Sequence, residues 1–248
     1  MTDLKDIEQS ELALDDTFTF GCKGCGECCH NRHDILLTPY DIYRVSKCLR
    51  ITPQKLFERY CETYIGQESH IPIVRLKPKT PAKLSARQRQ AGIKVCPLLQ
   101  NNKCIAHKLK PVLCALFPLG RFHRLETKTG QPTNAYFLVD GTVCRGRVSQ
   151  SKSYTVKKWL KMFNIPEHDR SPDIWGDIVN RTRKIVTDVK PLPKEQLLDI
   201  YRVFLMLMYL NYDYNEDFVP QFESNAAKFI EVADRIRTNK DKEKVAIQ

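Results

Sequence analysis

The chain has 248 residues, ten of them cysteine, and a formal net charge of +11. A chain of this length can bury a hydrophobic core without crosslinks, so disulfides are not needed to stabilise the fold. The most apolar run, 203–210, is much shorter than the roughly 20 residues of a membrane-spanning helix, so we expect a soluble protein.

Residues 1–19 form an acidic N-terminal segment, which begins MTDLKDIEQSELALDD. It has neither the basic start nor the apolar stretch of a secretory signal, so we expect a cytoplasmic protein. In a reducing compartment, clustered cysteines indicate metal binding or catalysis more often than disulfides.

A turn with four cysteines follows, CKGCGECC at 22–29. Two residues between thiolates let a tight turn direct both sulfurs to one centre, and Gly24 and Gly26 give the backbone the freedom that this requires. Cys28 and Cys29 are adjacent, so in an extended chain their side chains point to opposite sides. The pair favours two metal centres, one polynuclear cluster, or one cysteine that binds no metal.

Two short helices are predicted next. Each begins with a threonine N-cap and a proline, at Thr38-Pro39 in TPYDIYRVSKCL and at Thr52-Pro53 in TPQKLFERYCETY. Cys48 is expected on the first helix and Cys61 on a helical face of the second. Both are predicted to be packed core thiols rather than ligands.

The middle of the chain is predicted to contain short strands at 70–77 and 134–141. CPLLQNNKC is predicted to turn tightly at Asn101-Asn102. KLKPVLCALFPLG, at 108–120, is expected to be a short helix that ends near Pro118.

The later part of the chain is predicted to be helical. Apolar residues recur at helical spacing in three segments, 155–163, 191–212 and 222–236. The expected fold class is therefore mainly α, or α+β with a small amount of sheet around a cysteine-rich metal centre. We expect a cysteine-cluster domain at 20–165 and a helical extension at 166–248 that packs on the same domain.

Zinc and an iron-sulfur cluster are both consistent with the cysteines. C-x2-C-x2-C is the local part of a ferredoxin-like run, whereas eight thiolates would make two tetrahedral zinc sites. Nearby histidines are alternative ligands or outer partners of the ligands: His30, His33, His107 and His123.

Four segments and the isolated Cys144 resemble the YkgJ-type cysteine-cluster family. The segments are GCKGCGECC, LLTPYDIYRVSKCLRITPQKLFERY, CPLLQNNKC and KPVLCALFP. This family is also called the CxxCxxCC zinc- or iron-chelating domain, and the resemblance covers 20–165. It implies zinc or iron as cofactor and a metal-binding set of eight cysteines: Cys22, Cys25, Cys28, Cys29, Cys96, Cys104, Cys114 and Cys144. The chain departs from the family pattern at Lys110 and Ala115, where the pattern has arginines, and neither residue reproduces a guanidinium fork.

A metal-binding protein with a structural or redox-active centre is the favoured function. The sequence is rich in ligands but shows no glycine-rich phosphate loop, nucleophile motif or paired carboxylates. The first alternative is a metal-dependent enzyme similar to flagellin lysine N-methylase, which the resemblance alone implies. Whether the chain is an enzyme is left open.

A nucleic-acid-binding protein is the second alternative. No acidic residue occurs between Glu68 and Glu126, whereas lysine and arginine are frequent there. The basic stretch 75–124 therefore indicates an anionic partner, although a basic surface that maintains solubility explains it equally well.

Overall fold

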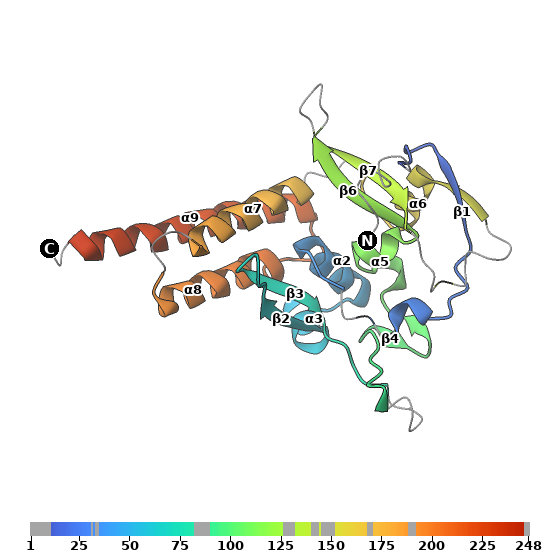
Figure 1. Cartoon of the computed structure of the whole chain (residues 1–248), viewed down its shortest axis with the longest axis horizontal. Helices are drawn as coiled ribbons and strands as arrows, with labels where there is room; N and C mark the ends of the chain where they lie inside the picture. The colour runs from blue at the N-terminus through green and yellow to red at the C-terminus, as the bar shows by residue number, and fades with distance from the viewer. Residues whose placement is uncertain are drawn as a thin grey trace. The chain divides into compact units, whose positions relative to one another are not determined.

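The structure, a computed structural model of the chain, shows mostly helix with pairs of short strands (Figure 1). It describes residues 11–30, 32, 35–81, 90–125, 132–139, 144, 152–167, 171–187 and 192–245. The predicted class, mainly α with a small amount of sheet, is confirmed. Within the described ranges, no helix is both long enough and apolar enough to cross a membrane.

Contacts divide the chain into two compact units. The first unit comprises 1–32 and 78–169, and the second comprises 33–77 and 170–248. Residues 33–77, which the sequence analysis placed in the cysteine-cluster domain, are thus grouped with the C-terminal helices. The predicted division at 165/166 stays a prediction.

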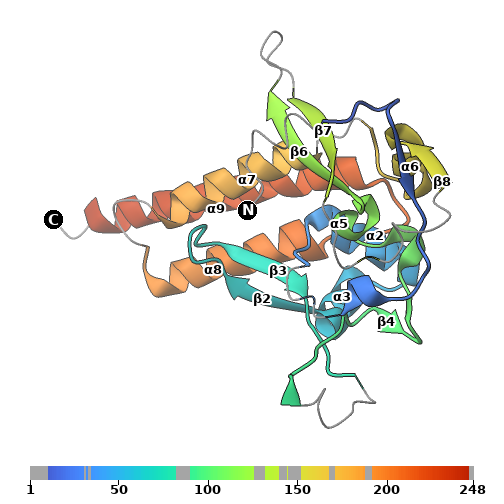
Figure 2. The same ribbon diagram turned by 45° about the vertical axis from the view of Figure 1, so that its right-hand side comes forward.

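The strands of the first unit form two-stranded antiparallel sheets. The first strand, TFTF, alternates exposed threonine with buried phenylalanine, the pattern of a half-buried strand. Figure 2 shows this strand together with its partner β8. The pairs are β1 (Thr17–Phe20) with β8 (Lys152–Thr155), β4 (Leu99–Gln100) with β5 (Lys103–Cys104), and β6 (Leu119–Leu125) with β7 (Pro132–Leu138).

Trp159 lies at the centre of the first unit's core. It is on α6 (Val156–Met162), and its ring packs edge-on against Phe18 at 5.5 Å and Phe20 at 5.7 Å between centroids. Its indole N–H donates to the carbonyls of Ala115 and Leu116 on α5 (Val112–Leu116), at 3.1 and 3.0 Å. Such pairs add to the burial energy of the rings, so this tryptophan joins β1, α5 and α6 into one core.

The second unit begins with the two predicted helices. Thr38 forms a capping box with Asp41 at the start of α2 (Pro39–Leu49), and Thr52 caps α3 (Pro53–Tyr60). These caps satisfy amides that have no partner within the helix, which is why both helices begin where the sequence predicts.

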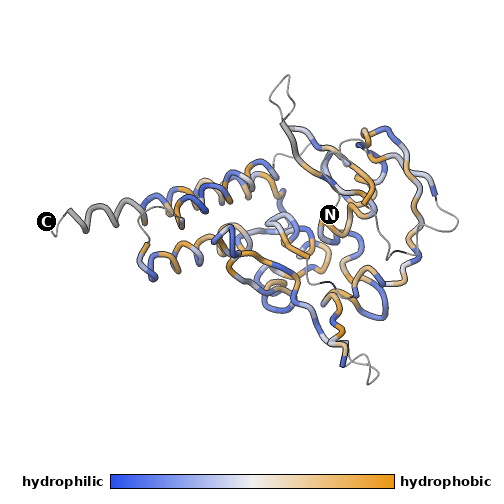
Figure 3. The backbone as a smooth tube through the Cα atoms, viewed as in Figure 1, coloured by the Kyte–Doolittle hydropathy of each residue, from blue (hydrophilic) through white to orange (hydrophobic). Residues whose placement is uncertain are grey.

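The rest of the second unit is a hairpin and three later helices. Figure 3 shows hydrophobic and hydrophilic residues alternating along these helices, as expected for amphipathic helices with one buried side. Phe204, Phe222 and Phe229 are buried between them. The elements are β2 (Cys61–Ile65), β3 (Pro72–Leu76), α7 (Ser171–Val186), α8 (Lys194–Leu205), a π-helical turn (Met206–Leu210) and α9 (Phe218–Val245).

One helix prediction is wrong at its end. Helix α3 stops at Tyr60, and Cys61 is the first residue of β2, paired with Leu76 of β3. Cys61 is nevertheless buried, as predicted for a core thiol. Residues 82–89 of the basic stretch 75–124 lie outside the described residues.

Candidate metal centre

The cysteine turn is built on two glycines and one turn of 3₁₀ helix. Gly24 and Gly26 have φ angles of +62° and +75°, in the left-handed region that glycine enters without a Cβ penalty. A 3₁₀ helix follows at Glu27–Cys29, in which the Cys29 amide donates to the Gly26 carbonyl at 2.9 Å. This tight backbone carries Cys28 and Cys29 on consecutive residues.

A second cysteine segment forms a β-turn and a hairpin. Cys96 and Leu99 close the β-turn, because the Leu99 amide donates to the Cys96 carbonyl at 3.0 Å, with Pro97 at the second position. Strands β4 and β5 then pair Leu99 with Cys104. The hairpin turns at Asn101 and Asn102, both with positive φ, which confirms the predicted tight turn.

The cysteine turn lies directly against this hairpin. The Cys96 amide donates to the Cys29 carbonyl at 2.8 Å, and His30 forms an antiparallel bridge with Val95. A Cβ atom on Gly26 would lie 2.9 Å from the carbonyl oxygen of Asn102, closer than real Cβ contacts. Glycine is therefore required at this position both for its φ angle and for this close approach.

Three thiols from the two segments are linked by side-chain hydrogen bonds. Cys28 bonds with Cys29, and Cys29 bonds with Cys96. Cys104 is close enough to act on Cys29 through its charge. Cys28, Cys29 and Cys96 are therefore linked although they come from separate segments, and Cys104 lies within electrostatic range of Cys29.

The pKa values of Cys28 and Cys29 reflect this crowding. The hydrogen bond with Cys29, then burial, raises the pKa of Cys28 far above its ordinary value. For Cys29, the hydrogen bond with Cys28 lowers the pKa. This effect is outweighed by the hydrogen bond with Cys96, by burial, and by the charges of Cys96 and Cys104. The pKa of Cys29 is therefore raised to about 12. Adjacent thiols resist simultaneous ionisation, so without a cation Cys28 and Cys29 keep their protons.

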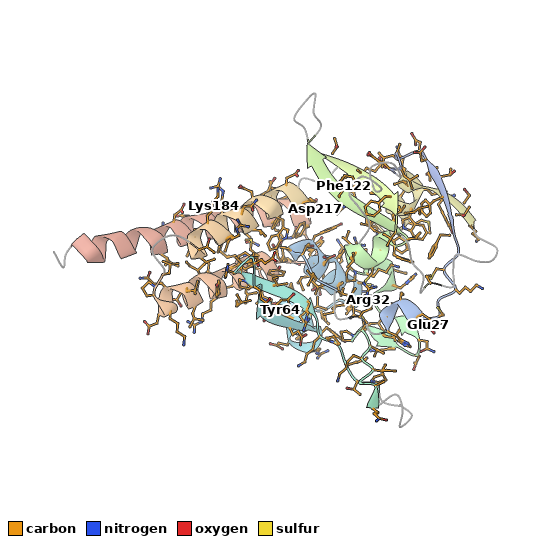
Figure 4. The ribbon with its side chains drawn as sticks, in the orientation of Figure 1. Glu27, Arg32, Tyr64, Phe122, Lys184 and Asp217 are labelled. Atoms are coloured by element: carbon orange, nitrogen blue, oxygen red, sulfur yellow. The ribbon has the colours of Figure 1, made fainter. Side chains whose placement is uncertain are left out.

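Two cationic side chains act in the opposite direction on Cys28. Lys110 and Arg32 each lower its pKa by their positive charge. Glu27 and Arg32, labelled in Figure 4, lie on either side of the Cys28-Cys29 pair along the chain. Lys110 also lies over the Phe163 ring, with its Nζ 4.5 Å from the centroid.

Residues 21–145 match the family model named CxxCxxCC, described as a putative zinc- or iron-chelating domain. The chain belongs to this family. The match confirms the resemblance noted in the sequence and supports metal binding of the zinc or iron type. Comparison with curated proteins and comparison with solved structures each gave no significant match.

The remaining predicted ligands of the CxxCxxCC domain lie at different depths. Cys22 and Cys25 are exposed on the first part of the turn. Cys114 is half-buried on α5, and Cys144 is half-buried against the core around Trp159. All ten cysteines are among the described residues, and none forms a disulfide.

The two cysteines predicted to be core thiols rather than ligands lie in the second unit. Cys48 is half-buried on α2, and Cys61 is 7% exposed at the start of β2. Burial raises the pKa of Cys61 to about 12. Neither belongs to the unit that carries the CxxCxxCC cysteines.

The donor set fits zinc or iron by its chemistry. All eight predicted ligands are thiols, the soft donors that bind zinc and iron-sulfur clusters. Within the part of the chain that the structure describes, no three His, Cys, Asp or Glu side chains are already arranged to hold a metal ion. The full set of eight ligands therefore stays a prediction.

The histidines near the cysteines differ in their surroundings. His30 Nδ1 lies 3.9 Å from a carboxylate oxygen of Glu27. His107 packs edge-on against Phe163, and burial, with the charge of Lys110, lowers its pKa. His33 and the side chain of His123 lie outside the described residues.

Several basic residues of the stretch 75–124 have partners within the protein. Arg75 pairs with Glu62 at 2.7 Å and lies over the Tyr64 ring. The Lys79 ammonium donates to two backbone carbonyls, and Lys94 donates to Thr80. These contacts explain part of the basic composition by structure, and an anionic partner stays a prediction.

Proposed function

We propose that this CxxCxxCC protein binds zinc or an iron-sulfur cluster through eight thiolates, in the reducing environment of the cytoplasm. The ligands are the cysteines predicted from the sequence: Cys22, Cys25, Cys28, Cys29, Cys96, Cys104, Cys114 and Cys144. The observation that carries the proposal is the hydrogen bond from the Cys96 amide to the Cys29 carbonyl at 2.8 Å. It joins two cysteine segments that are far apart in the chain.

The linked thiols support metal ligation over an alternative role as buried core residues. Taken as whole residues, Cys28 is exposed and Cys29 half-buried, although the protein around their sulfurs raises both pKa values. Neither is fully buried, as a core thiol would be. A metal ion binds thiolates and so displaces protons from such a cluster. The raised pKa values of Cys28 and Cys29 imply that metal uptake releases protons near neutral pH.

A single centre of eight thiolates requires the other four cysteines to lie against this cluster, whereas two four-thiolate sites would divide the set between them. Cys22 and Cys25 are on the same exposed turn, where the positive φ of Gly24 permits rearrangement at small cost. A metal that draws together segments from different parts of a chain couples its binding energy to folding. The proposed centre would therefore stabilise the first unit in addition to any redox role.

Anaerobic purification followed by elemental analysis, acid-labile sulfide determination and a visible absorption spectrum tests this function. Iron with sulfide and a brown colour would identify a cluster, and zinc in a colourless sample would identify thiolate zinc sites. A chain that contains neither metal, and takes up neither when reduced and reconstituted, would contradict the proposal. Zinc at one ion per chain would contradict the part that assigns all eight thiolates.

A further inference from the structure

Lys79 is joined to the segment that carries Cys96 by four hydrogen bonds. Its amide donates to the Val95 carbonyl at 2.9 Å, and the Val95 amide donates to the Lys79 carbonyl at 2.8 Å. Its Nζ donates to the carbonyls of Pro97 and Leu99, both at 3.0 Å. One lysine therefore holds this segment by its backbone and by its side chain.

The two carbonyls bound by the ammonium flank the ligand positions. Pro97 directly follows Cys96 and is the second residue of the turn that Cys96 and Leu99 close. Leu99 is paired with Cys104 across β4 and β5. The Lys79 ammonium thus fixes the turn after one predicted ligand and the strand residue opposite another.

The chemistry of an ammonium suits this task. It presents three donors and no acceptor, and hydrogen bonds from a charged donor are stronger than bonds between neutral groups. Two carbonyls that converge on one side of a turn repel each other, and a shared cation removes that repulsion. A turn held in this way keeps Cys96 against Cys29, the carbonyl of which accepts the Cys96 amide.

We infer that Lys79 is a positioning residue of the metal centre, which orders Cys96 and Cys104 before the metal binds. The inference rests on the proposed function, thiolate ligation of zinc or iron. Lys79 contacts no metal in this role and acts through the backbone of the ligand segment. The sequence alone placed it only among the basic residues of the stretch 75–124.

Metal titration of the full chain, reduced and metal-free, tests the inference. The probe is cobalt(II) if the protein is purified with zinc, and iron with sulfide if it is purified with iron. Lys79→Met keeps the aliphatic stem but loses the donors, and should bind metal about tenfold more weakly. Its absorption spectrum at saturating metal should also differ from that of the wild type, because the ligand sulfurs are less well ordered.

Two variants make the comparison specific. Lys79→Arg should recover part of the affinity but keep an altered spectrum, because a planar guanidinium places its donors differently from an ammonium. Lys103→Met removes an exposed lysine beside Cys104 and should match the wild type in affinity and spectrum. This control separates loss of the hydrogen bonds from the Lys79 ammonium to the Pro97 and Leu99 carbonyls from loss of one positive charge near the thiols.

The outcomes separate the inference from the proposed function. Wild-type affinity and spectrum in Lys79→Met would overturn the inference and leave the metal-binding function supported. A wild-type chain that binds no metal would overturn both. If circular dichroism shows that Lys79→Met does not fold, Lys79→Arg decides: an altered spectrum supports the inference, and an unchanged spectrum and affinity overturn it.

Discussion

The Cys96 amide donates to the Cys29 carbonyl at 2.8 Å, and the two side chains are also hydrogen-bonded. This double contact, through backbone and thiols, places the two residues where one metal centre would use both. It also means that removal of either thiol would alter the proposed centre without breaking the backbone bond.

Replacement of Cys96 by serine should therefore lower bound metal and the melting temperature, because a serine hydroxyl is a poor substitute for a thiolate and structural metal binding is coupled to folding. The backbone bond to Cys29 is kept, so the loss reports on the ligand. Metal per chain and thermal melting are the measurements. Cys48→Ala, which removes a half-buried thiol in the second unit, should keep its metal; the ligand assignment is wrong if Cys48→Ala loses metal and Cys96→Ser keeps it.

The two glycines of the cysteine turn offer a matched pair. Both have left-handed φ angles, so alanine should cost about 1 kcal/mol of stability at either position from backbone strain. At Gly24 a Cβ meets nothing within 4 Å, whereas at Gly26 it would lie 2.9 Å from the Asn102 carbonyl oxygen. Gly26→Ala should be the more destabilising and should also weaken metal binding.

Urea unfolding and metal titration of both alanine variants measure this difference. Equal losses of stability for Gly24→Ala and Gly26→Ala would show that the turn does not depend on its close approach to the hairpin.

Local signals accounted for much of the fold. The helix starts at Thr38 and Thr52 were predictable because a capping threonine and the amide it binds are three residues apart. The strand at Cys61 was not predictable in this way. Its apolar spacing with Phe57 and Tyr60 also fits a helix, and only its pairing with Leu76 makes it a strand.

The candidate site was predictable in composition but not in geometry. The spacing of the cysteines identified the turn at 22–29, because ligands for one ion must be close in sequence or brought close by a turn. The family resemblance grouped Cys29 with Cys96 in one ligand set, but nothing in the sequence predicts the hydrogen bond between them or the contact of Lys79 with Pro97. Those contacts depend on how separate segments pack. The sequence does not distinguish a lysine that binds carbonyls from a lysine in solvent.

Trp159→Phe tests the link between the core and the segment that carries Cys114. The substitution removes the N–H that donates to the carbonyls of Ala115 and Leu116, and should cost about 2 kcal/mol from the buried acceptors left without it. Because α5 carries Cys114, metal affinity should fall as well. Urea unfolding and metal titration are the measurements.

Trp175→Phe is the matched control for this substitution. Trp175 is half-buried on α7 in the second unit, with ring contacts to Phe204 and Tyr209. The Trp175→Phe variant should have a lower free energy of unfolding than the wild type but the same metal affinity. The proposed link between Trp159 and the centre is wrong if the two variants have the same metal affinity.

The buried thiol of Cys61 gives the protein a pH dependence in the alkaline range. Burial raises its pKa to about 12 in the folded chain, whereas an unfolded cysteine has a pKa of about 8.5. A raised folded pKa stabilises the fold fully below the unfolded pKa, and this contribution is lost as the pH rises toward the folded value. The free energy of unfolding should fall by up to about 1.4 kcal/mol per pH unit from this group above about pH 8.5.

Cys61→Ala should remove this dependence at the cost of a small cavity, about 1 kcal/mol at neutral pH. The measurement is the free energy of unfolding in urea at several pH values, for wild type and variant under reducing conditions. Burial also raises the pKa values of Tyr209 and Tyr212, and the charge of Cys61 raises that of Tyr209 further. Both proteins keep these tyrosines, so the difference reports the Cys61 thiol together with its interaction with Tyr209. The variant should therefore approach and then exceed the wild type in stability as the pH rises, and a difference that stays constant would show that the Cys61 thiol ionises as readily in the folded chain as in the unfolded one.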